Sequence, residues 1–340
     1  MRGKIAVEEH FVTPELKDTI FGSIGWDPAE WEAMASALQE TDEVRLADMD
    51  AAGIEVAAIS LAAPCIQDIV DPVAATEAAA GANDALAAVV AAHPDRYVGL
   101  AALALQEPES AADELERCVT ELGFRGALAN GYSSVGDLDT AAYYDEPQYE
   151  VFWDRVARLG VPFYLHPRNP LPNSRYYQGR EMLLGPTWAF TVETATHSLR
   201  LMVSGLFDRH PGLQIIIGHM GELLPFAVAR TEQRLSHIPT LKLDRGPQDL
   251  LRENFFITTS GNFHTQSLIG AILQVGADRI LFAADYPFER TAEAAGWFDA
   301  VAISETDRLK IGRTNAASLL GVAFPGDMPE KATPAGAVGG

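Results

Sequence analysis

Cysteine is almost absent from this 340-residue sequence, in which Cys65 and Cys118 are the only two. Two isolated cysteines exclude a disulfide framework and a cysteine-based zinc site, and they fit a reducing cytoplasm. Basic residues are also scarce, since 25 Lys and Arg stand against 47 Asp and Glu, a formal charge of −22. An acidic surface without a Lys/Arg-rich run repels nucleic acid and anionic membranes, so neither is expected as a partner.

Long hydrophobic runs are missing as well. No stretch approaches the ~20 consecutive apolar residues of a transmembrane helix, and acidic residues stand near the start where a signal peptide would be apolar. We therefore expect a cytoplasmic protein without a targeting or anchoring segment. The patterns GxGxxG, GxxxxGK, GxSxG and CxxC do not occur, so nucleotide, acyl-serine and thiol chemistry lack support.

The residues that are present indicate an ordinary globular chain, with 48% hydrophobic and 21% charged residues. Short apolar, β-branched runs alternate with longer amphipathic runs, which is typical of repeated β-α units around a parallel sheet. Eight strands are predicted near 4–12, 56–62, 97–102, 126–130, 162–166, 214–219, 255–260 and 279–285. The fold class is therefore α/β, and we expect one TIM (β/α)8 barrel over residues 1–322 followed by a flexible tail at 323–340.

Amphipathic periodicity predicts helices at 73–92, 110–122, 148–159, 192–207, 222–235, 265–274 and 306–319. Two connections exceed the ordinary length, namely the insertions at 20–46 after the first strand and 167–191 after the fifth. Both leave the carboxyl ends of their strands, where barrel enzymes build the walls of their active sites. Both insertions are therefore candidates for a substrate pocket.

Side chains that bind metals gather at the predicted strand ends. Strand side chains alternate, so Glu8 and His10 share a face while Glu9 points away. His166 and Asp285 end the fifth and eighth strands after apolar runs. Alternatives are a hydrogen-bonded or exposed Glu8, a core His166 bonded to a carbonyl, and an Asp285 that caps a helix or fixes a loop. Because the strand ends of a barrel share one mouth, we predict that Glu8, His10, His166 and Asp285 bind one divalent ion, Zn²⁺ or Mn²⁺.

A second pair of residues follows the sixth strand, where Glu222 comes three residues after His219. Residues at this spacing are neighbours at the start of a helix, so Glu222 can orient the imidazole and the pair can move protons. Alternatively, Glu222 only favours the positive helix N-terminus and His219 is a fifth ligand. His264, just past the seventh strand, is not expected to face the pocket.

Five segments together resemble a known family: KIAVEEHF, FYLHPRNPLP, GLFDRHPGLQIIIGHMGE, ITTSGNF and GADRILFAADYPFE. Their combination is similar to the decarboxylase branch of the amidohydrolase superfamily, over about residues 1–322. Within that branch the similarity is to the enzymes of γ-resorcylate (2,6-dihydroxybenzoate), with those of 2,3-dihydroxybenzoate and salicylate as near relatives.

The resemblance implies a TIM barrel that holds one Zn²⁺ or Mn²⁺ ion through the four residues named above, with no organic cofactor. It also implies a small aromatic carboxylate as substrate and a homo-oligomer, either a tetramer or a dimer. Phe288 and Arg230 match positions near the family's substrate pocket. Two departures bear on specificity: Ala62 stands where a polar asparagine is expected, and the segment ARTEQR around Arg230 is altered.

The implied reaction is the non-oxidative decarboxylation of an ortho-hydroxybenzoate that chelates the ion through its carboxylate and phenolic oxygens. Asp285 would protonate the ring carbon that bears the carboxylate, and the His219–Glu222 pair would supply the proton before CO₂ leaves. The rival is a metal-dependent hydrolase of a lactone or amide, in which Asp285 deprotonates a metal-bound water. The first strand favours the lyase, since it reads ExH rather than the HxH common in hydrolases of this superfamily. A purely structural metal is disfavoured because structural zinc sites are usually closed sets of Cys and His.

Overall fold

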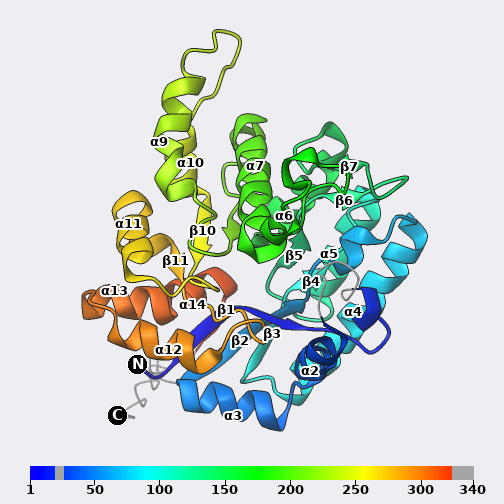
Figure 1. Ribbon diagram of the computed structural model, residues 1–340, viewed down its shortest axis with the longest axis vertical. Coiled ribbons are helices and arrows are strands. Elements are labelled where there is room, and N and C mark those ends of the chain that lie inside the picture. Colours follow the sequence, from blue (N-terminus) through cyan, green and yellow to red (C-terminus); the bar gives the residue numbers. More distant parts are fainter. Residues whose placement is uncertain (20–26, 324–340) are drawn as a thin grey trace, which may run out of the picture.

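The computed structural model describes residues 1–19 and 27–323, and parallel strands surrounded by helices form its centre (Figure 1). The strands of this parallel sheet are β1 (Lys4–Phe11), β2 (Ile54–Leu61), β3 (Tyr97–Gly99), β4 (Ala101–Ala102), β5 (Ala127–Asn130), β8 (Phe163–His166), β9 (Ile215–Ile217), β10 (Phe255–Thr258) and β11 (Ile280–Leu281). The α-helices are α2 (Pro28–Gln39), α3 (Glu43–Ala52), α4 (Pro72–Ala92), α5 (Pro108–Thr120), α6 (Glu150–Leu159), α7 (Ala189–Val203), α8 (Leu206–Arg209), α9 (Leu224–Leu235), α10 (Pro247–Glu253), α11 (Thr265–Val275), α12 (Thr291–Ala300), α13 (Glu305–Leu309) and α14 (Asn315–Leu320).

The parallel strands close into a barrel. They pair in the orders β1-β2-β3 and β4-β5-β8-β9-β10-β11. The short strands β3 and β4 are one strand interrupted at Leu100, whose N–H still donates to the Ile59 carbonyl at 2.9 Å. The circle closes between β11 and β1, where the Val7 N–H donates to Phe282 at 3.1 Å and a parallel bridge joins Glu9 to Tyr286. Eight strand positions result, so the predicted TIM barrel is confirmed.

A β-bulge in β1 sets the direction of its polar side chains. Ala6 pairs with Ala57 and Glu9 with Ile59, so β1 advances three residues while β2 advances two. The extra residue interrupts the alternation of the strand. As a result Ala6 and Glu9 both face the outer layer, where they line one small cavity, while Glu8 contacts groups inside the barrel. The bulge therefore turns Glu8 towards the interior and Glu9 towards the helices.

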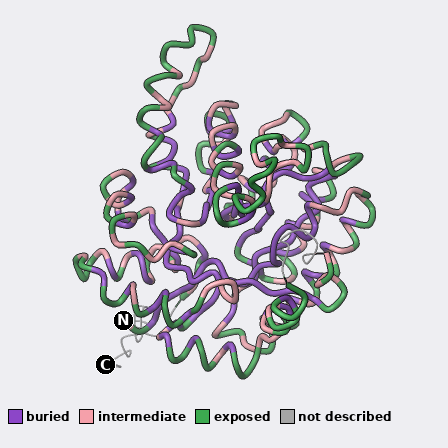
Figure 2. Tube along the Cα trace, in the orientation of Figure 1, coloured by how far each residue is buried: buried purple, intermediate pink, exposed green. Residues whose placement is uncertain are grey.

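The core has two parts, and the buried trace in Figure 2 follows the barrel strands. The larger part lies between the strands and the helices. The smaller part fills the barrel and is closed by α14, with the buried side chains Ile5, Val7, Val56, Ala58, Leu100, Leu128, Tyr164, Ile216, Leu281, Ala316 and Leu320. Layers of branched side chains make such a barrel a packed core, which leaves its open end for chemistry.

Several helices differ from the prediction. Of the insertion predicted at 20–46, residues 20–26 lie outside the described residues, and the rest contains α2 and the start of α3. Neither α10 nor α12 was predicted. The helix predicted at 222–235 begins only at Leu224, and the one at 306–319 is α13 and α14 joined by a π-helical turn, Lys310–Thr314. The predicted tail lies outside the described residues from position 324 onward. No helix in the described ranges is both long and apolar enough to cross a bilayer.

Candidate active site

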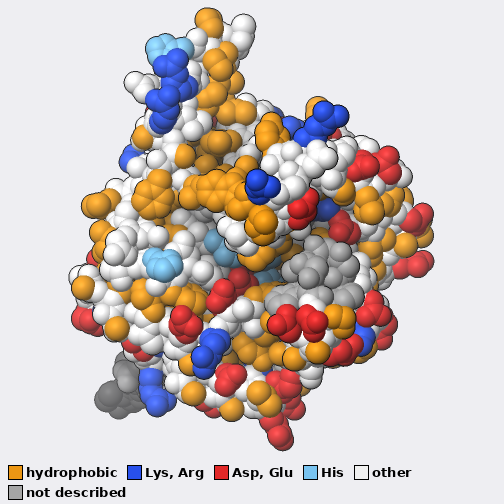
Figure 3. Space-filling model, in the orientation of Figure 1, with side chains coloured by type: hydrophobic (Ala, Val, Ile, Leu, Met, Phe, Trp, Pro, Cys, Tyr) orange, Lys and Arg blue, Asp and Glu red, His pale blue; other side chains and the backbone are white. Residues whose placement is uncertain are grey.

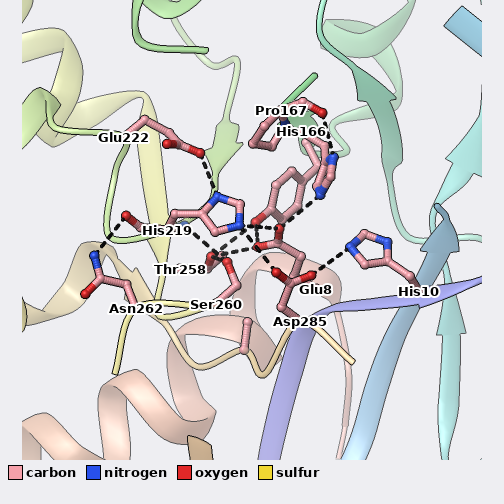
Figure 4. Close-up of polar contacts among 12 residues, drawn as sticks. Glu8, His10, His166, Pro167, His219, Glu222, Thr258, Ser260, Asn262 and Asp285 are labelled. Atoms are coloured by element: carbon pink, nitrogen blue, oxygen red, sulfur yellow. Dashed lines mark hydrogen bonds and ion pairs between the residues drawn. The ribbon is translucent and has the colours of Figure 1, made fainter. Parts of the chain in front are cut away.

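Four side chains from three barrel strands meet at the carboxyl ends of those strands. One ligand atom from each of Glu8, His10, His166 and Asp285 lies within 4.8 Å of the others. Glu8 and His10 lie on β1, His166 ends β8, and Asp285 follows β11. Figure 4 shows their side chains converging from these elements. The structure therefore brings together the whole predicted ligand set, and the chain has a four-residue metal site.

The atoms that face the centre fit a divalent ion. Glu8 Oε1 is 3.3 Å from His166 Nε2, and Asp285 Oδ1 is 3.2 Å from His10 Nε2. Glu8 Oε1, His10 Nε2 and Asp285 Oδ1 are buried without a hydrogen-bond partner. Buried polar atoms are normally paired because leaving them unpaired is costly. Two carboxylates and two imidazoles are a donor set that suits both Zn²⁺ and Mn²⁺.

The two histidines are held so that Nε2 faces the centre. The Nδ1 atom of His10 is 3.2 Å from Ser60 Oγ, and that of His166 is 3.1 Å from the carbonyl oxygen of Pro167. A carbonyl only accepts, so His166 carries its proton on Nδ1 and leaves the Nε2 lone pair free for a metal. The carbonyl contact that was the alternative to ligation for His166 is therefore compatible with ligation through Nε2.

Two residues that the sequence did not single out hold Glu8. The Tyr164 hydroxyl donates to Glu8 Oε2, and Thr258 Oγ1 donates to the same atom at 3.0 Å. Tyr164 lies two residues before His166 on the same strand face, and Thr258 ends β10. Strand periodicity offered a signal for both, because polar side chains facing a barrel interior next to a ligand need a partner there.

The His219–Glu222 contact arises from an unusual turn. His219 Nδ1 is 2.6 Å from Glu222 Oε1, and Glu222 is 1% exposed. The expectation that the two lie at a helix start was wrong, because α9 begins at Leu224. Residues 219–223 all have positive φ instead, which L-residues rarely adopt. The pair is therefore made by a left-handed turn that is held by its surroundings.

Hydrogen bonds from the end of β10 hold this turn. The His219 N–H donates to Ser260 Oγ at 3.1 Å, and the Met220 N–H donates to the Thr258 carbonyl at 2.8 Å. The Asn262 side-chain amide also donates to the His219 carbonyl, at 3.4 Å. Polar groups from one strand end thus fix the direction of the imidazole.

The electrostatics couple His219 to the acids. Burial alone would lower the pKa of His219, but the Glu222 and Glu8 carboxylates outweigh it and raise that pKa well above its usual value. Burial alone would raise the pKa of Asp285, but the neighbouring imidazoles of His10 and His219 hold it below its usual value. His219 Nε2 lies 3.4 Å from Asp285 Oδ2. The imidazole is thus the group most easily protonated beside the metal site.

The residues expected near the substrate fall in different places. The Phe288 ring is 5.7 Å from the His10 ring and inclined by 62°, next to the metal site. Arg230 is exposed on α9, about two turns beyond its start, and lies outside the four-residue cluster. Ala62 is fully buried just after β2. Phe288 therefore borders the metal site, whereas the role of Arg230 stays a prediction.

The insertion after β8 lines a cavity of about 730 Å³. Its wall includes Arg168, which is two residues beyond His166, together with Ala63 and Tyr177. The Arg168 guanidinium pairs with Asp68 and donates to the Tyr132 carbonyl at 2.6 Å, so its charge is already balanced. None of the four proposed metal ligands is among the residues that line this cavity, so the expected role of the insertion in a substrate pocket stays a prediction.

Comparison with known proteins gives the site a family. The profile described as Amidohydrolase matches residues 10–322. The chain belongs to the amidohydrolase family. The gamma-resorcylate decarboxylase of Rhizobium sp. (strain MTP-10005) is 54% identical over 324 residues, which are 94% of this chain and 98% of that protein. This amidohydrolase is accordingly a carboxy-lyase, so the lyase rather than the hydrolase prediction is confirmed.

Solved structures of similar proteins agree with the barrel and its site. A crystal structure of 2,6-dihydroxybenzoate decarboxylase complexed with 2,6-dihydroxybenzoate has a TM-score of 0.92 and 52% identity, covering 95% of this chain and 100% of that one. The dihydroxybenzoic acid decarboxylase from Polaromonas sp. JS666, with bound manganese and the inhibitor 2-nitroresorcinol, has a TM-score of 0.90 and 52% identity. This match covers 94% of the present chain and 97% of the Polaromonas chain.

Proposed function

We propose that this amidohydrolase decarboxylates 2,6-dihydroxybenzoate to resorcinol and CO₂, with Mn²⁺ ahead of Zn²⁺ as its metal. The observation that carries the proposal is the convergence of four ligand atoms, three of them without a hydrogen-bond partner, beside a protonatable His219. The similarity to a 2,6-dihydroxybenzoate complex and to a manganese-bound decarboxylase supports the choice of substrate and metal. The reaction is reversible in principle.

The residues of the site have two roles, which are to hold the metal ion and to transfer a proton to the substrate. When bound, the divalent ion stabilises negative charge on the carboxylate and ortho oxygen of the substrate. Asp285 Oδ2 gives a proton to the ring carbon that bears the carboxylate, and the bond from that carbon to the carboxylate then breaks. The bonding electrons return to the ring, which becomes aromatic again, and CO₂ leaves. One proton is consumed for each CO₂ released.

His219 replaces the proton that Asp285 gives. Its Nε2 is 3.4 Å from Asp285 Oδ2, and Glu222 stabilises the imidazolium from the other side of the ring at 2.6 Å. Asp285 alone is a poor store of protons because its pKa is held below the usual value. The proton is therefore kept on His219 and passed to Asp285, which lets Asp285 act as the acid despite its lowered pKa. Phe288 provides an apolar edge against which the aromatic ring can lie.

Product analysis in D₂O tests the reaction. The purified protein, stripped with a chelator and reloaded with Mn²⁺ or Zn²⁺, is assayed with 2,6-, 2,3- and 2,4-dihydroxybenzoate, salicylate and 5-carboxyvanillate. We expect the highest kcat/KM with 2,6-dihydroxybenzoate and one deuterium at C2 of resorcinol. Preference for another acid of this panel would replace the substrate assignment, and resorcinol without ring deuterium would contradict the proton transfer.

Asp285→Asn tests the acid. We expect decarboxylation per bound ion to fall by at least ~10²-fold, in the range of lost general acid catalysis, while the affinity for 2-nitroresorcinol changes little. Metal content is measured in each preparation because Asp285 is also a proposed ligand. Asp145→Asn is the control, since that carboxylate pairs with Arg200 at 2.7 Å away from the four ligands. Full activity in the metal-loaded Asp285→Asn protein would remove Asp285 from this role.

We further infer a homo-oligomer, a tetramer or a dimer, in the cytoplasm. Exposed apolar side chains on α9 and α11 support it, among them Phe226, which is 61% exposed, and Leu273, which is 82% exposed. Figure 3 shows hydrophobic side chains gathered below the projecting end of α9. Such patches are typical of interaction sites. The buried free thiols of Cys65 and Cys118 fit a reducing compartment. Light scattering of the purified chain tests the assembly, and a monomer at micromolar concentration would contradict it.

A further inference from the structure

Glu9 is a buried carboxylate that the proposed reaction does not use. It is 4% exposed, and the bulge in β1 turns it away from the metal and towards α3. There it borders a small cavity with Ala6, Met49 and Thr291 among its lining residues. A buried carboxylate in mostly apolar surroundings needs partners, and the partners of Glu9 are informative.

Both carboxylate oxygens of Glu9 accept hydrogen bonds from backbone that flanks Asp285. Oε1 accepts from the Ala284 N–H at 2.9 Å, and Oε2 accepts from the Tyr286 N–H at 3.2 Å. The residue between these two donors, Asp285, has φ +76°. An aspartate rarely holds this left-handed conformation unless its surroundings enforce it.

The backbone of β1 on both sides of Glu9 makes two further hydrogen bonds to this segment. The Asp285 N–H donates to the Glu8 carbonyl at 3.0 Å, and the His10 N–H donates to the Tyr286 carbonyl at 2.8 Å. Three consecutive residues of β1 are therefore hydrogen-bonded to the three consecutive residues centred on Asp285. The side chain of Glu9 supplies two of these four bonds, and it spans the strained residue from both sides.

We propose that Glu9 is a positioning residue, which fixes the backbone of Asp285 so that Oδ1 faces the metal and Oδ2 faces His219. The proposal rests on the proposed function only in taking Asp285 as ligand and acid. Released from Glu9, residues 284–286 would lose two backbone hydrogen bonds, and φ of Asp285 would be free to relax. The carboxylate would then spread over several directions, although the other three ligands stay in place.

Arg45 supports the same layer from α3. It is 2% exposed, its guanidinium donates to the His10 carbonyl at 2.7 Å, and it lies over the Tyr286 ring at 4.4 Å from the centroid. It thus touches the residue after Asp285 and a ligand residue of β1. This arrangement gives the insertion after β1 a role in shaping the metal site from behind.

Glu9→Gln tests the proposal with Mn²⁺ as the probe. The amide keeps one acceptor, but its NH₂ group meets one of the two N–H donors, so one bond is lost. We expect Mn²⁺ affinity to fall by roughly 10–100-fold, as for other groups that orient metal ligands, and the EPR spectrum of the bound ion to change. With 2,6-dihydroxybenzoate, kcat should fall at least tenfold while KM changes less than threefold.

Glu114→Gln is the control for the loss of a hydrogen-bonded, partly buried carboxylate. Glu114 accepts from Asn83 at 2.7 Å and from Arg117 at 2.8 Å, and it lies outside the metal cluster. We expect it to lower Tm about as much as Glu9→Gln while leaving Mn²⁺ affinity and the EPR spectrum unchanged. If Glu9→Gln lowers Tm but keeps the wild-type Mn²⁺ affinity, EPR spectrum and kcat, Glu9 has only a structural role and the proposal is overturned.

Glu9→Asp carries the test if Glu9→Gln does not fold. The shorter side chain keeps the carboxyl group but cannot reach both N–H groups, so Mn²⁺ affinity and the EPR spectrum should again change. Wild-type values for both would overturn the proposal. Affinity and EPR need no substrate, so they decide the role of Glu9 even if the wild-type enzyme leaves 2,6-dihydroxybenzoate intact. That second result would contradict only the proposed substrate.

Discussion

Replacing Tyr164 by Phe should weaken metal binding while the fold is kept. Tyr164 is fully buried, and its hydroxyl donates to Glu8 Oε2, to which Thr258 also donates at 3.0 Å. The variant keeps the ring and removes one of these donors. A hydrogen bond to a charged group is worth roughly 1.5–3 kcal/mol, and about 1.4 kcal/mol is a factor of ten in a binding constant. Mn²⁺ affinity should therefore fall by roughly 10–100-fold, the range typical of groups that orient metal ligands.

Competition against a fluorescent chelator measures this affinity in the purified variant. Tyr149→Phe is the control, because that tyrosine is also buried and its hydroxyl donates to the Leu105 carbonyl at 2.9 Å, outside the metal site. It should cost some stability and leave Mn²⁺ affinity unchanged. Affinity within threefold of wild type for Tyr164→Phe, or an equal loss in the control, would refute the view that the hydroxyl orients Glu8.

Three further perturbations test other parts of the molecule. Glu222→Gln should lower kcat by ~10²-fold or more without loss of bound metal, and in a pH–rate profile it should move the alkaline limb to lower pH, since the raised pKa of His219 depends first on this carboxylate. Gly261→Ala should lower kcat at least ~10-fold because a Cβ would lie 3.2 Å from His219 Cδ2, whereas Gly136→Ala, also at positive φ but with open space, should leave kcat unchanged. Burial lowers the pKa of His197 to about 3, whereas in the unfolded chain this histidine has its usual pKa of about 6.5. Between these two pH values the unfolded chain binds a proton on His197 that the folded protein does not, so the free energy of unfolding falls as the pH falls through this window. From pH 7 to 5 it falls by about 2 kcal/mol. Urea denaturation at both pH values should show this loss in wild type and not in His197→Gln.

The sequence was sufficient to bring the four proposed metal ligands together at one point, because two regularities decide where they lie. Parallel strands of a barrel end at one mouth, and side chains two apart on a strand share a face. Glu8, His10, His166 and Asp285 could be assigned on these grounds before any distance was known. The strand pattern was likewise visible, since strands covered on both sides are apolar nearly throughout.

Features that depend on contacts between segments could not be predicted in this way. The bulge in β1 appears only when its register against β2 is known, so Glu9 was taken simply as pointing away from the metal. The turn at 219–223 has a sequence compatible with a helix start, and hydrogen bonds from the end of β10, which no local pattern reveals, help to hold it in positive φ. Arg230 was assigned by a motif, which fixes a position along α9 but not what that position faces.

Strain connects these unpredicted features to the chemistry. Non-glycine residues with positive φ occur at both ends of the proposed proton path: His219, Met220, Glu222, Leu223 and Asp285. Each costs roughly 1–2 kcal/mol relative to ordinary backbone, which is substantial for a domain whose net stability is about 5–15 kcal/mol. The compensation is local, because Ser260 and Thr258 bond the backbone at 219–220, and Glu9 bonds the backbone on both sides of Asp285. A substitution at one of these supports should therefore misdirect the acid or the imidazole before it unfolds the barrel, so its effect is expected in kcat and metal affinity more than in Tm.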